Sequence, residues 1–234
     1  NVTFKVVEDG QLVINPRSVT LTSEGGSKPY DGQPLTKPDV TVDGEGFVAG
    51  EVTNIRATGT ITDVGTVTNT IDYEKSANFK ESNYAITKEE GKLSITAVTE
   101  KVTVTITEHS GTVKYDGTEH TVTGYDVAIS NPLYKEGDFT FSGNAEVKGT
   151  NAGTYNMELK PENFANNNTN FAEVKFLIVD GKLEITKRSV KLTSASDEKV
   201  YDGKPLTNET VEVGGDGFAD GEGATYDFTG SQTD

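Results

Sequence analysis

A short motif that recurs at nearly constant spacing is the feature that most constrains the fold of this sequence. Tyr30-Asp31-Gly32 returns as Tyr115-Asp116-Gly117 and again as Tyr201-Asp202-Gly203, at intervals of 85 and 86 residues. A fixed period is typical of tandem arrays in which each unit is one small fold. The chain is therefore predicted to consist of repeats of about 85–90 residues, each with its own small core.

A second landmark keeps step with this motif. An acidic residue and a glycine, followed by Leu and Ile two and four positions later, occur at Asp9-Gly10, Glu90-Gly91 and Asp180-Gly181. We interpret this pattern as the closing segment of each unit. The landmarks predict four parts, which are the C-terminal tail of a preceding repeat (1–14), a complete repeat (15–96), a complete repeat of variant type (97–186) and the truncated front part of a further repeat (187–234).

The hydrophobic pattern within the units has a period of two. From Val102 to Thr107, apolar residues alternate with threonines, which predicts a strand with one buried face. Similar short stretches are bounded by Gly, Asn and Asp, so the fold class is predicted as all-β, with tandem small antiparallel β-sandwich repeats of immunoglobulin-like build. Only five residues lead from Ile185 to Val190, and such short junctions predict an elongated rod.

A β-grasp-like repeat is the alternative, and it requires a helix packed on its sheet. The best helix candidates, 73–84 and 161–171, are rich in Asn and weakly periodic, which favours the sandwich. The pairs Glu90-Gly91 and Asp180-Gly181 are expected to form tight turns between strands, because Gly accepts positive φ.

Composition excludes several classes of partner. The net charge of −16 repels phosphate backbones, so nucleic acid is not an expected partner. The chain has no Cys, which removes disulfides and thiolate metal sites. No apolar run approaches the roughly 20 residues that a spanning helix needs, so no membrane insertion is expected in this fragment.

The Tyr-Asp-Gly motif allows two interpretations. Three exposed tyrosines at regular spacing, Tyr30, Tyr115 and Tyr201, could line a stripe that binds a ligand. Alternatively the tyrosine ring plugs one end of the core while Asp and Gly form a turn. We favour the structural interpretation of all nine motif residues.

The search for catalytic chemistry gives no candidate. The only histidines, His109 and His120, lie in the second repeat and have no counterpart in the first, so an enzyme is not expected and no catalytic residue is assigned. The chain has no P-loop, no dinucleotide fingerprint and no His-Glu-x-x-His motif.

Calcium is the alternative to the prediction that the chain has no cofactor. Two acidic loops offer hard oxygen ligands, and their candidate residues are Asp43, Glu45, Asp216, Asp220 and Glu222. The second loop fails the EF-hand pattern, since Phe218 occupies a ligand position. A calcium site that clamps a junction between repeats remains the alternative.

The order of these motifs resembles a known family. Tyr-Asp-Gly, then Gly65-Thr66 or Gly153-Thr154, then Asn83-Tyr84-Ala85-Ile86, then the closing Gly91 pattern is similar to the YDG/MBG-type repeats of large bacterial surface proteins and adhesins. The resemblance implies an extracellular location, on the bacterial cell surface or secreted, and an immunoglobulin-like module without catalytic residues. The variant repeat departs from the pattern, with Asn170-Phe171 at the Asn-Tyr position and a longer segment before Gly181.

Two functions from different classes follow. The repeats could be stalk or spacer modules in cell adhesion, with neighbouring repeats of the same chain as their partners. Alternatively, individual repeats could bind a glycan, mucin or host protein. An accessory region of a secreted enzyme is the more distant alternative. The spacer is favoured, because the tyrosine motif is the only sequence candidate for a ligand site.

Overall fold

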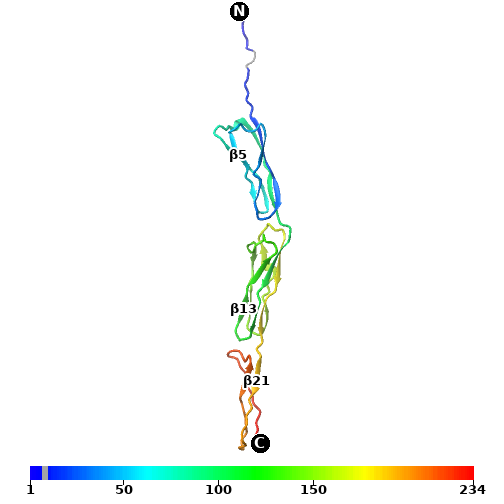
Figure 1. Cartoon of the computed structure of the whole chain (residues 1–234), viewed down its shortest axis with the longest axis vertical. Coiled ribbons are helices and arrows are strands. Elements are labelled where there is room, and N and C mark those ends of the chain that lie inside the picture. Colours follow the sequence, from blue (N-terminus) through cyan, green and yellow to red (C-terminus); the bar gives the residue numbers. More distant parts are fainter. Residues whose placement is uncertain (7–9) are drawn as a thin grey trace. The chain divides into compact units, whose positions relative to one another are not determined.

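The computed structural model describes residues 1–6 and 10–234. Asp9 of the first closing pattern, and with it part of the predicted tail 1–14, lies outside the described residues. Contacts divide the chain into two compact units, Asn1–Lys101 with Asn168–Glu173, and Val102–Asn167 with Val174–Asp234. In Figure 1 the labels β5 and β13 mark the two complete repeats, and β21 marks the last part of the chain.

The predicted all-β class is confirmed. The described residues form strands and three one-turn 3₁₀ helices, η1 (Glu81–Asn83), η2 (Glu136–Asp138) and η3 (Pro161–Asn163). Two of these turns, η1 and η3, occupy the segments that were the best helix candidates, so no helix of the described chain could support a β-grasp. Likewise, none of the helices in the described ranges is long and apolar enough to cross a membrane.

The strands of unit 1 cover the first complete repeat. In chain order they are β1 (Arg17–Ser23), β2 (Gly26–Pro29), β3 (Leu35–Thr36), β4 (Val40–Gly44), β5 (Val52–Ala57), β6 (Thr60–Ile61), β7 (Gly65–Thr68), β8 (Ile71–Lys75), β9 (Tyr84–Glu89) and β10 (Lys92–Thr96). They pair as sheets β4-β1-β9, β2-β10-β7, β3-β6 and β5-β8. The hydrophobic core joins β1 and β9 to β8 across the layers, through the buried residues Val19, Leu21, Ile71 and Tyr84.

The strands of unit 2 cover the second repeat and the last part of the chain. In chain order they are β11 (Val102–Glu108), β12 (Gly111–Lys114), β13 (His120–Thr123), β14 (Tyr125–Ile129), β15 (Phe139–Phe141), β16 (Glu146–Gly149), β17 (Gly153–Asn156), β18 (Phe164–Asn166), β19 (Val174–Val179), β20 (Lys182–Thr186), β21 (Val190–Ser194) and β22 (Val211–Gly215). The sheets are β14-β11-β19, β12-β20-β17, β13-β16, β15-β18 and β21-β22.

Aromatic rings fill the space between the sheets of the second repeat. Phe176 of β19 packs on Phe139 of β15 and on Phe164 of β18, with ring centroids 5.4 and 5.5 Å apart. The alternating residues Val102, Val104 and Ile106 of β11 are fully buried, as their period of two predicts. Two layers around an apolar interior match the predicted sandwich.

The three-stranded sheets are mixed, because the first strand of each complete repeat pairs in parallel with the last. In unit 1, β1 pairs with β9 and β2 with β10; in unit 2, β11 pairs with β19 and β12 with β20. In unit 1 the chain passes from β1 to β2 and from β9 to β10, and both passages lead from the same first sheet to the same second sheet. In unit 2 the passages from β11 to β12 and from β19 to β20 do the same. The sequence predicted an antiparallel sandwich, and this parallel pairing is the part it did not show.

The crossing point corrects the prediction of tight turns at Glu90-Gly91 and Asp180-Gly181. The strands on either side of Gly91 do not pair with each other but join different sheets, and neither Gly91 nor Gly181 has a positive φ. A Cβ on Gly91 would lie 2.4 Å from the carbonyl carbon of Glu24, and a Cβ on Gly181 would lie 2.3 Å from the His109 carbonyl oxygen. The glycines are therefore needed for close approach of two backbones.

Buried polar groups satisfy the backbone at this crossing. In unit 2 the carboxylate of Glu108, only 3% exposed, accepts hydrogen bonds from the amides of Gly181 and Leu159, both at 2.7 Å. In unit 1 the Gly91 amide donates to the Ser23 hydroxyl at 3.1 Å, and that hydroxyl donates to the Asn69 carbonyl at 2.6 Å. Burial of unpaired amides would be costly, so each repeat supplies its own acceptor.

Gly181→Ala is expected to lower the free energy of unfolding of unit 2. The added methyl group meets backbone rather than a flexible side chain, so strands must move apart, at a cost of about 1–3 kcal/mol. Hydrogen exchange of the β11 amides measures the effect. Gly137→Ala is the control, since nothing lies within 4 Å of its Cβ. Equal exchange in the two variants would contradict the close-approach argument.

Glu108→Gln is expected to destabilise the same unit. The amide side chain keeps one acceptor oxygen but presents an NH₂ group to the second backbone donor, and one buried unsatisfied amide costs roughly 1–3 kcal/mol. Urea unfolding of the full chain, followed at unit 2 residues by NMR, measures the loss. Exposed Glu162 provides the matched control, Glu162→Gln. A change below about 0.5 kcal/mol, the usual range for surface substitutions, would count against a paired buried carboxylate.

Candidate functional site

The Asp-Gly part of the repeated motif forms the same turn in all three places. The aspartate Oδ1 accepts a hydrogen bond from the backbone amide two residues later, at 2.9, 2.9 and 3.0 Å for Gln33, Thr118 and Lys204. The glycine that follows has a positive φ each time, +75°, +82° and +78° for Gly32, Gly117 and Gly203. The turn therefore requires left-handed backbone at its third residue, which glycine adopts without strain.

A cationic or neutral donor braces each of these aspartates from the side. Lys28 bonds Asp31 at 2.7 Å and Lys199 bonds Asp202 at 2.8 Å. The hydrogen bond from the lysine is the main reason that the pKa of each carboxyl is lowered, and the hydrogen bond from the turn amide is the second.

The variant repeat replaces the lysine with two other donors. The Thr118 hydroxyl lies 2.7 Å and His120 Nε2 lies 2.9 Å from Asp116 Oδ1. The Thr118 side chain, the Thr118 amide and His120, in that order, lower the pKa of Asp116 to about 2. Asp116 is the central group here, whereas nucleophilic catalysis places the histidine between hydroxyl and carboxylate. The arrangement therefore stabilises a turn and does not activate a nucleophile.

His109 is the other histidine of the sequence. Its Nδ1 lies 2.8 Å from the Thr123 carbonyl oxygen and its Nε2 lies 3.3 Å from Asp126 Oδ1. The Thr123 carbonyl is the first cause that raises the pKa of His109, and Asp126 is the second. The ring joins two neighbouring strand ends at the surface.

The tyrosines of the motif have three different surroundings. Tyr30 and Tyr115 are half-buried and outside the core, while Tyr201 is 74% exposed. The Tyr30 ring packs edge-on against Phe171 of unit 1, with centroids 5.8 Å apart at 74°. The Tyr115 hydroxyl donates to Glu222, which is the first cause that raises its pKa. The interpretation of the motif tyrosine as a plug at one end of the core stays a prediction, since Tyr30 and Tyr115 are half-buried and not fully buried.

The segment that contacts Tyr30 in unit 1 is the one in which the variant repeat departs from the family pattern. Asn170 Oδ1 accepts from the Val64 amide at 2.7 Å, and Asn170 Nδ2 donates to Asp63 at 2.9 Å. Phe171 forms an isolated parallel bridge with Val98. Asn170 and Phe171, which come before the longer segment, therefore belong to unit 1 together with the rest of Asn168–Glu173.

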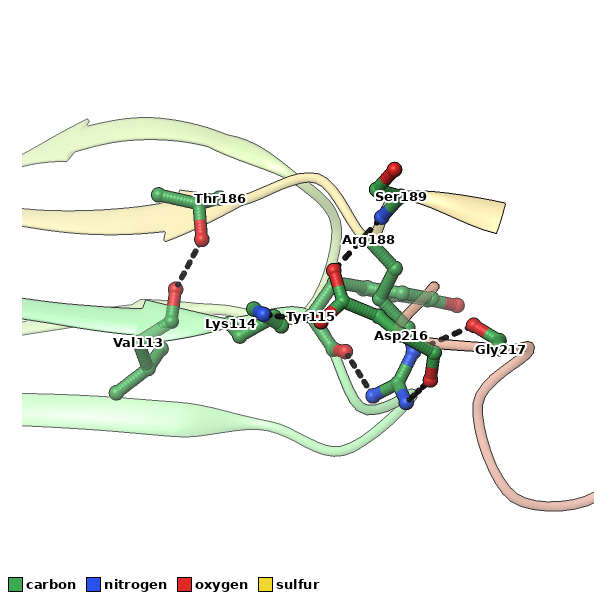
Figure 2. Close-up of polar contacts among 8 residues, drawn as sticks. All are labelled: Val113, Lys114, Tyr115, Thr186, Arg188, Ser189, Asp216 and Gly217. Atoms are coloured by element: carbon green, nitrogen blue, oxygen red, sulfur yellow. Dashed lines mark hydrogen bonds and ion pairs between the residues drawn. The ribbon is translucent and has the colours of Figure 1, made fainter. Parts of the chain in front are cut away.

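A cluster around Arg188 joins the motif of the second repeat to the last part of the chain (Figure 2). Arg188 donates from Nε to the Gly217 carbonyl at 2.9 Å and from Nη1 to the Tyr115 carbonyl at 3.2 Å; Nη2 donates to the Asp216 carbonyl. The Asp216 carboxylate accepts the Ser189 amide at 2.8 Å and forms an ion pair with Lys114. Lys114 is the first cause that lowers the pKa of Asp216, and the Ser189 amide is the second.

The first repeat contains the counterpart of this cluster. Arg17 donates from Nε to the Gly46 carbonyl at 3.0 Å and from Nη2 to the Glu45 carbonyl, and Glu45 Oε2 accepts the Ser18 amide at 3.0 Å. The recurring Arg-Ser pair of the sequence thus fastens the start of a strand to an acidic turn. The sequence showed the recurrence but gave no signal for the partner.

The residues considered as calcium ligands are mostly bonded to protein donors. Glu45 and Asp216 accept backbone amides, and Glu222 accepts the Tyr115 hydroxyl. Asp43 pairs with Thr20 within the β1–β4 ladder, and Asp220 is exposed. Within residues 1–6 and 10–234, no three His, Cys, Asp or Glu side chains form a group that could hold a metal ion.

Asp116 is expected to titrate with a midpoint near 2, below the ordinary value of 3.8. Because this pKa is lowered on folding, the stability that Asp116 contributes is present above pH 4 and is lost as the pH falls from about 4 to about 2. Carboxyl NMR shifts measured against pH test this midpoint. Thr118→Val removes the hydroxyl donor and should raise the pKa toward 3.8; a midpoint near 3.8 in the unchanged chain would refute the hydrogen-bonded turn.

Comparison with known proteins identifies one segment. Residues 101–187 match the family model of the MBG domain. No curated protein and no solved structure matches the chain.

Proposed function

We propose, from the premise that residues 101–187 form an MBG domain, that this chain is a non-catalytic stalk or spacer module of a bacterial surface protein. The MBG domain is a bacterial repeat module, and the chain would act outside the cell, where it would hold a binding region away from the surface during adhesion. Its partners would be the neighbouring repeats.

The observation that carries this proposal is the use of the motif residues within the fold. Each of the three motif aspartates accepts a hydrogen bond within its own turn. Arg188 donates hydrogen bonds to three carbonyl oxygens of the same unit. A ligand site keeps convergent polar groups for its ligand. Here those groups are already paired, which supports a structural role.

The surroundings of the motif tyrosines in the two complete repeats support the same reading. A ligand stripe would present the same face of each ring. Instead the Tyr30 ring packs on Phe171, whereas the Tyr115 hydroxyl donates to Glu222.

Recognition of a glycan, mucin or host protein is the second candidate, and one observation favours it. An open cavity of about 300 Å³ lies beside Tyr115, and its wall includes Phe218 and Asn151. Aromatic faces beside an amide suit a polar ligand with an apolar face. This candidate and the exposed Tyr201 define the variants for the test.

The full chain is expected to show no saturable binding to a glycan array or to mucin, either with calcium or with a chelator. Surface plasmon resonance on immobilised mucin gives the second measurement. Saturable binding that Tyr201→Ala or Tyr115→Ala abolishes, with an unchanged circular dichroism spectrum, would replace the spacer by a recognition module. Binding that requires calcium would reinstate a metal site at the acidic loops.

The spacer has a positive test as well. One or two copies of the chain are inserted between a surface anchor and a binding head of known ligand on a bacterial cell. Capture of ligand-coated beads through the cell's own surface layer should rise with copy number. Capture that does not change with copy number would count against the spacer.

A further inference from the structure

The strands at which a pulling force would enter and leave each complete repeat are paired with each other in parallel. In the second repeat, β11 pairs with β19 from Val102↔Val174 to Thr107↔Val179, and β12 pairs with β20 from Gly111↔Leu183 to Lys114↔Thr186. In the first repeat, β1–β9 and β2–β10 repeat this arrangement. In Figure 1 the blue first strand of that repeat runs beside the later green strand.

Parallel pairing decides how tension acts on these strands. The N-terminal end of the first strand and the C-terminal end of the last strand lie at opposite ends of the pair. Tension along the chain therefore pulls the two strands past each other along their own axes. Parallel ladders have evenly spaced hydrogen bonds, so the bonds share the load and must break together.

The pair is also held at its middle and at its end. At the crossing, Gly181 donates to the buried Glu108 carboxylate at 2.7 Å, and Gly91 donates to Ser23 in the first repeat. At the end, the amides of Tyr30 and Tyr115 donate to the carbonyls of Thr96 and Thr186, both at 2.9 Å. The tyrosine of the motif thus adds the last backbone bond of the parallel pair.

We propose that each complete repeat is a mechanical clamp, in which the parallel pair of first and last strands keeps the repeat folded under tensile force. The clamp rests on the proposed spacer function, because a stalk that holds an attached cell transmits the force of detachment. Forced unfolding is governed by the unfolding rate, so the clamp acts by slowing rupture under load.

The test compares two pulling directions on the same folded repeat. The chain has no Cys, so two introduced cysteines define where force is applied. Thr103→Cys with Val179→Cys pulls the opposite ends of β11 and β19 and shears the pair. Thr103→Cys with Lys175→Cys pulls two residues directly opposite each other and opens the pair one bond at a time.

The rupture force in single-molecule pulling of the full chain is expected to be higher in the shearing direction at equal pulling speed. The ratio should lie between about twofold and about fivefold, the upper value corresponding to equal sharing over the five residue pairs from Thr103↔Lys175 to Thr107↔Val179, which lie between the two pulled positions. Glu108→Gln in the shearing pair should lower the rupture force toward that of the opening pair. Equal forces in the two directions would overturn the clamp.

A second set of positions guards against misfolding of these variants. In the first repeat, Ser18→Cys with Glu89→Cys shears the pair and Ser18→Cys with Ala85→Cys opens it, since Ser18 lies opposite Ala85 and all three residues are exposed. The clamp and the spacer fail separately. Binding of a glycan would end the spacer proposal and leave the force ratio unchanged, whereas equal forces would end the clamp and leave the spacer.

Discussion

The close passage of the first and last strands is the constraint on which the rest of each repeat depends. Where the two strands change sheets together, their backbones approach so closely that a side chain at Gly91 or Gly181 would meet main-chain atoms. This crossing sets the parallel register on both sides of it. In the first repeat β4 and β7 pair with strands of this central pair, and in the second β14 and β17 do so, whereas the remaining strands form two-stranded sheets of their own.

The two complete repeats solve one problem of this crossing with different side chains. The amide of Ile71 in the first repeat and that of Leu159 in the second each need an acceptor. Glu90 accepts the first at 2.8 Å, and Glu108 accepts the second at 2.7 Å. A buried unpaired amide is costly whatever the sequence around it. Both repeats therefore provide a glutamate as acceptor, but the two glutamates stand at different positions of the repeat.

The repeated motif combines a conserved turn with variable surroundings along this one chain. Its aspartate and glycine form the same turn three times, because the geometry is local and depends on residues two positions apart. The tyrosine meets Phe171 in one place and Glu222 in another, since its neighbours come from distant parts of the sequence. The sequence therefore predicts the turn, whose residues are neighbours in the chain. It does not predict the contacts of the tyrosine ring or of Arg188, which come from distant residues.

The sequence by itself determined the repeat period, the all-β class and the inward positions of β11, because spacing and a period of two are properties of the chain read in order. Glu108 is an acid in phase with Val102, Val104 and Ile106, and that phase is a sequence signal of its burial. Only the tertiary structure decided that the closing glycines cross a neighbouring backbone instead of turning, and that first and last strands pair in parallel. Both depend on which distant segments meet in space, and no local pattern of residues encodes that pairing.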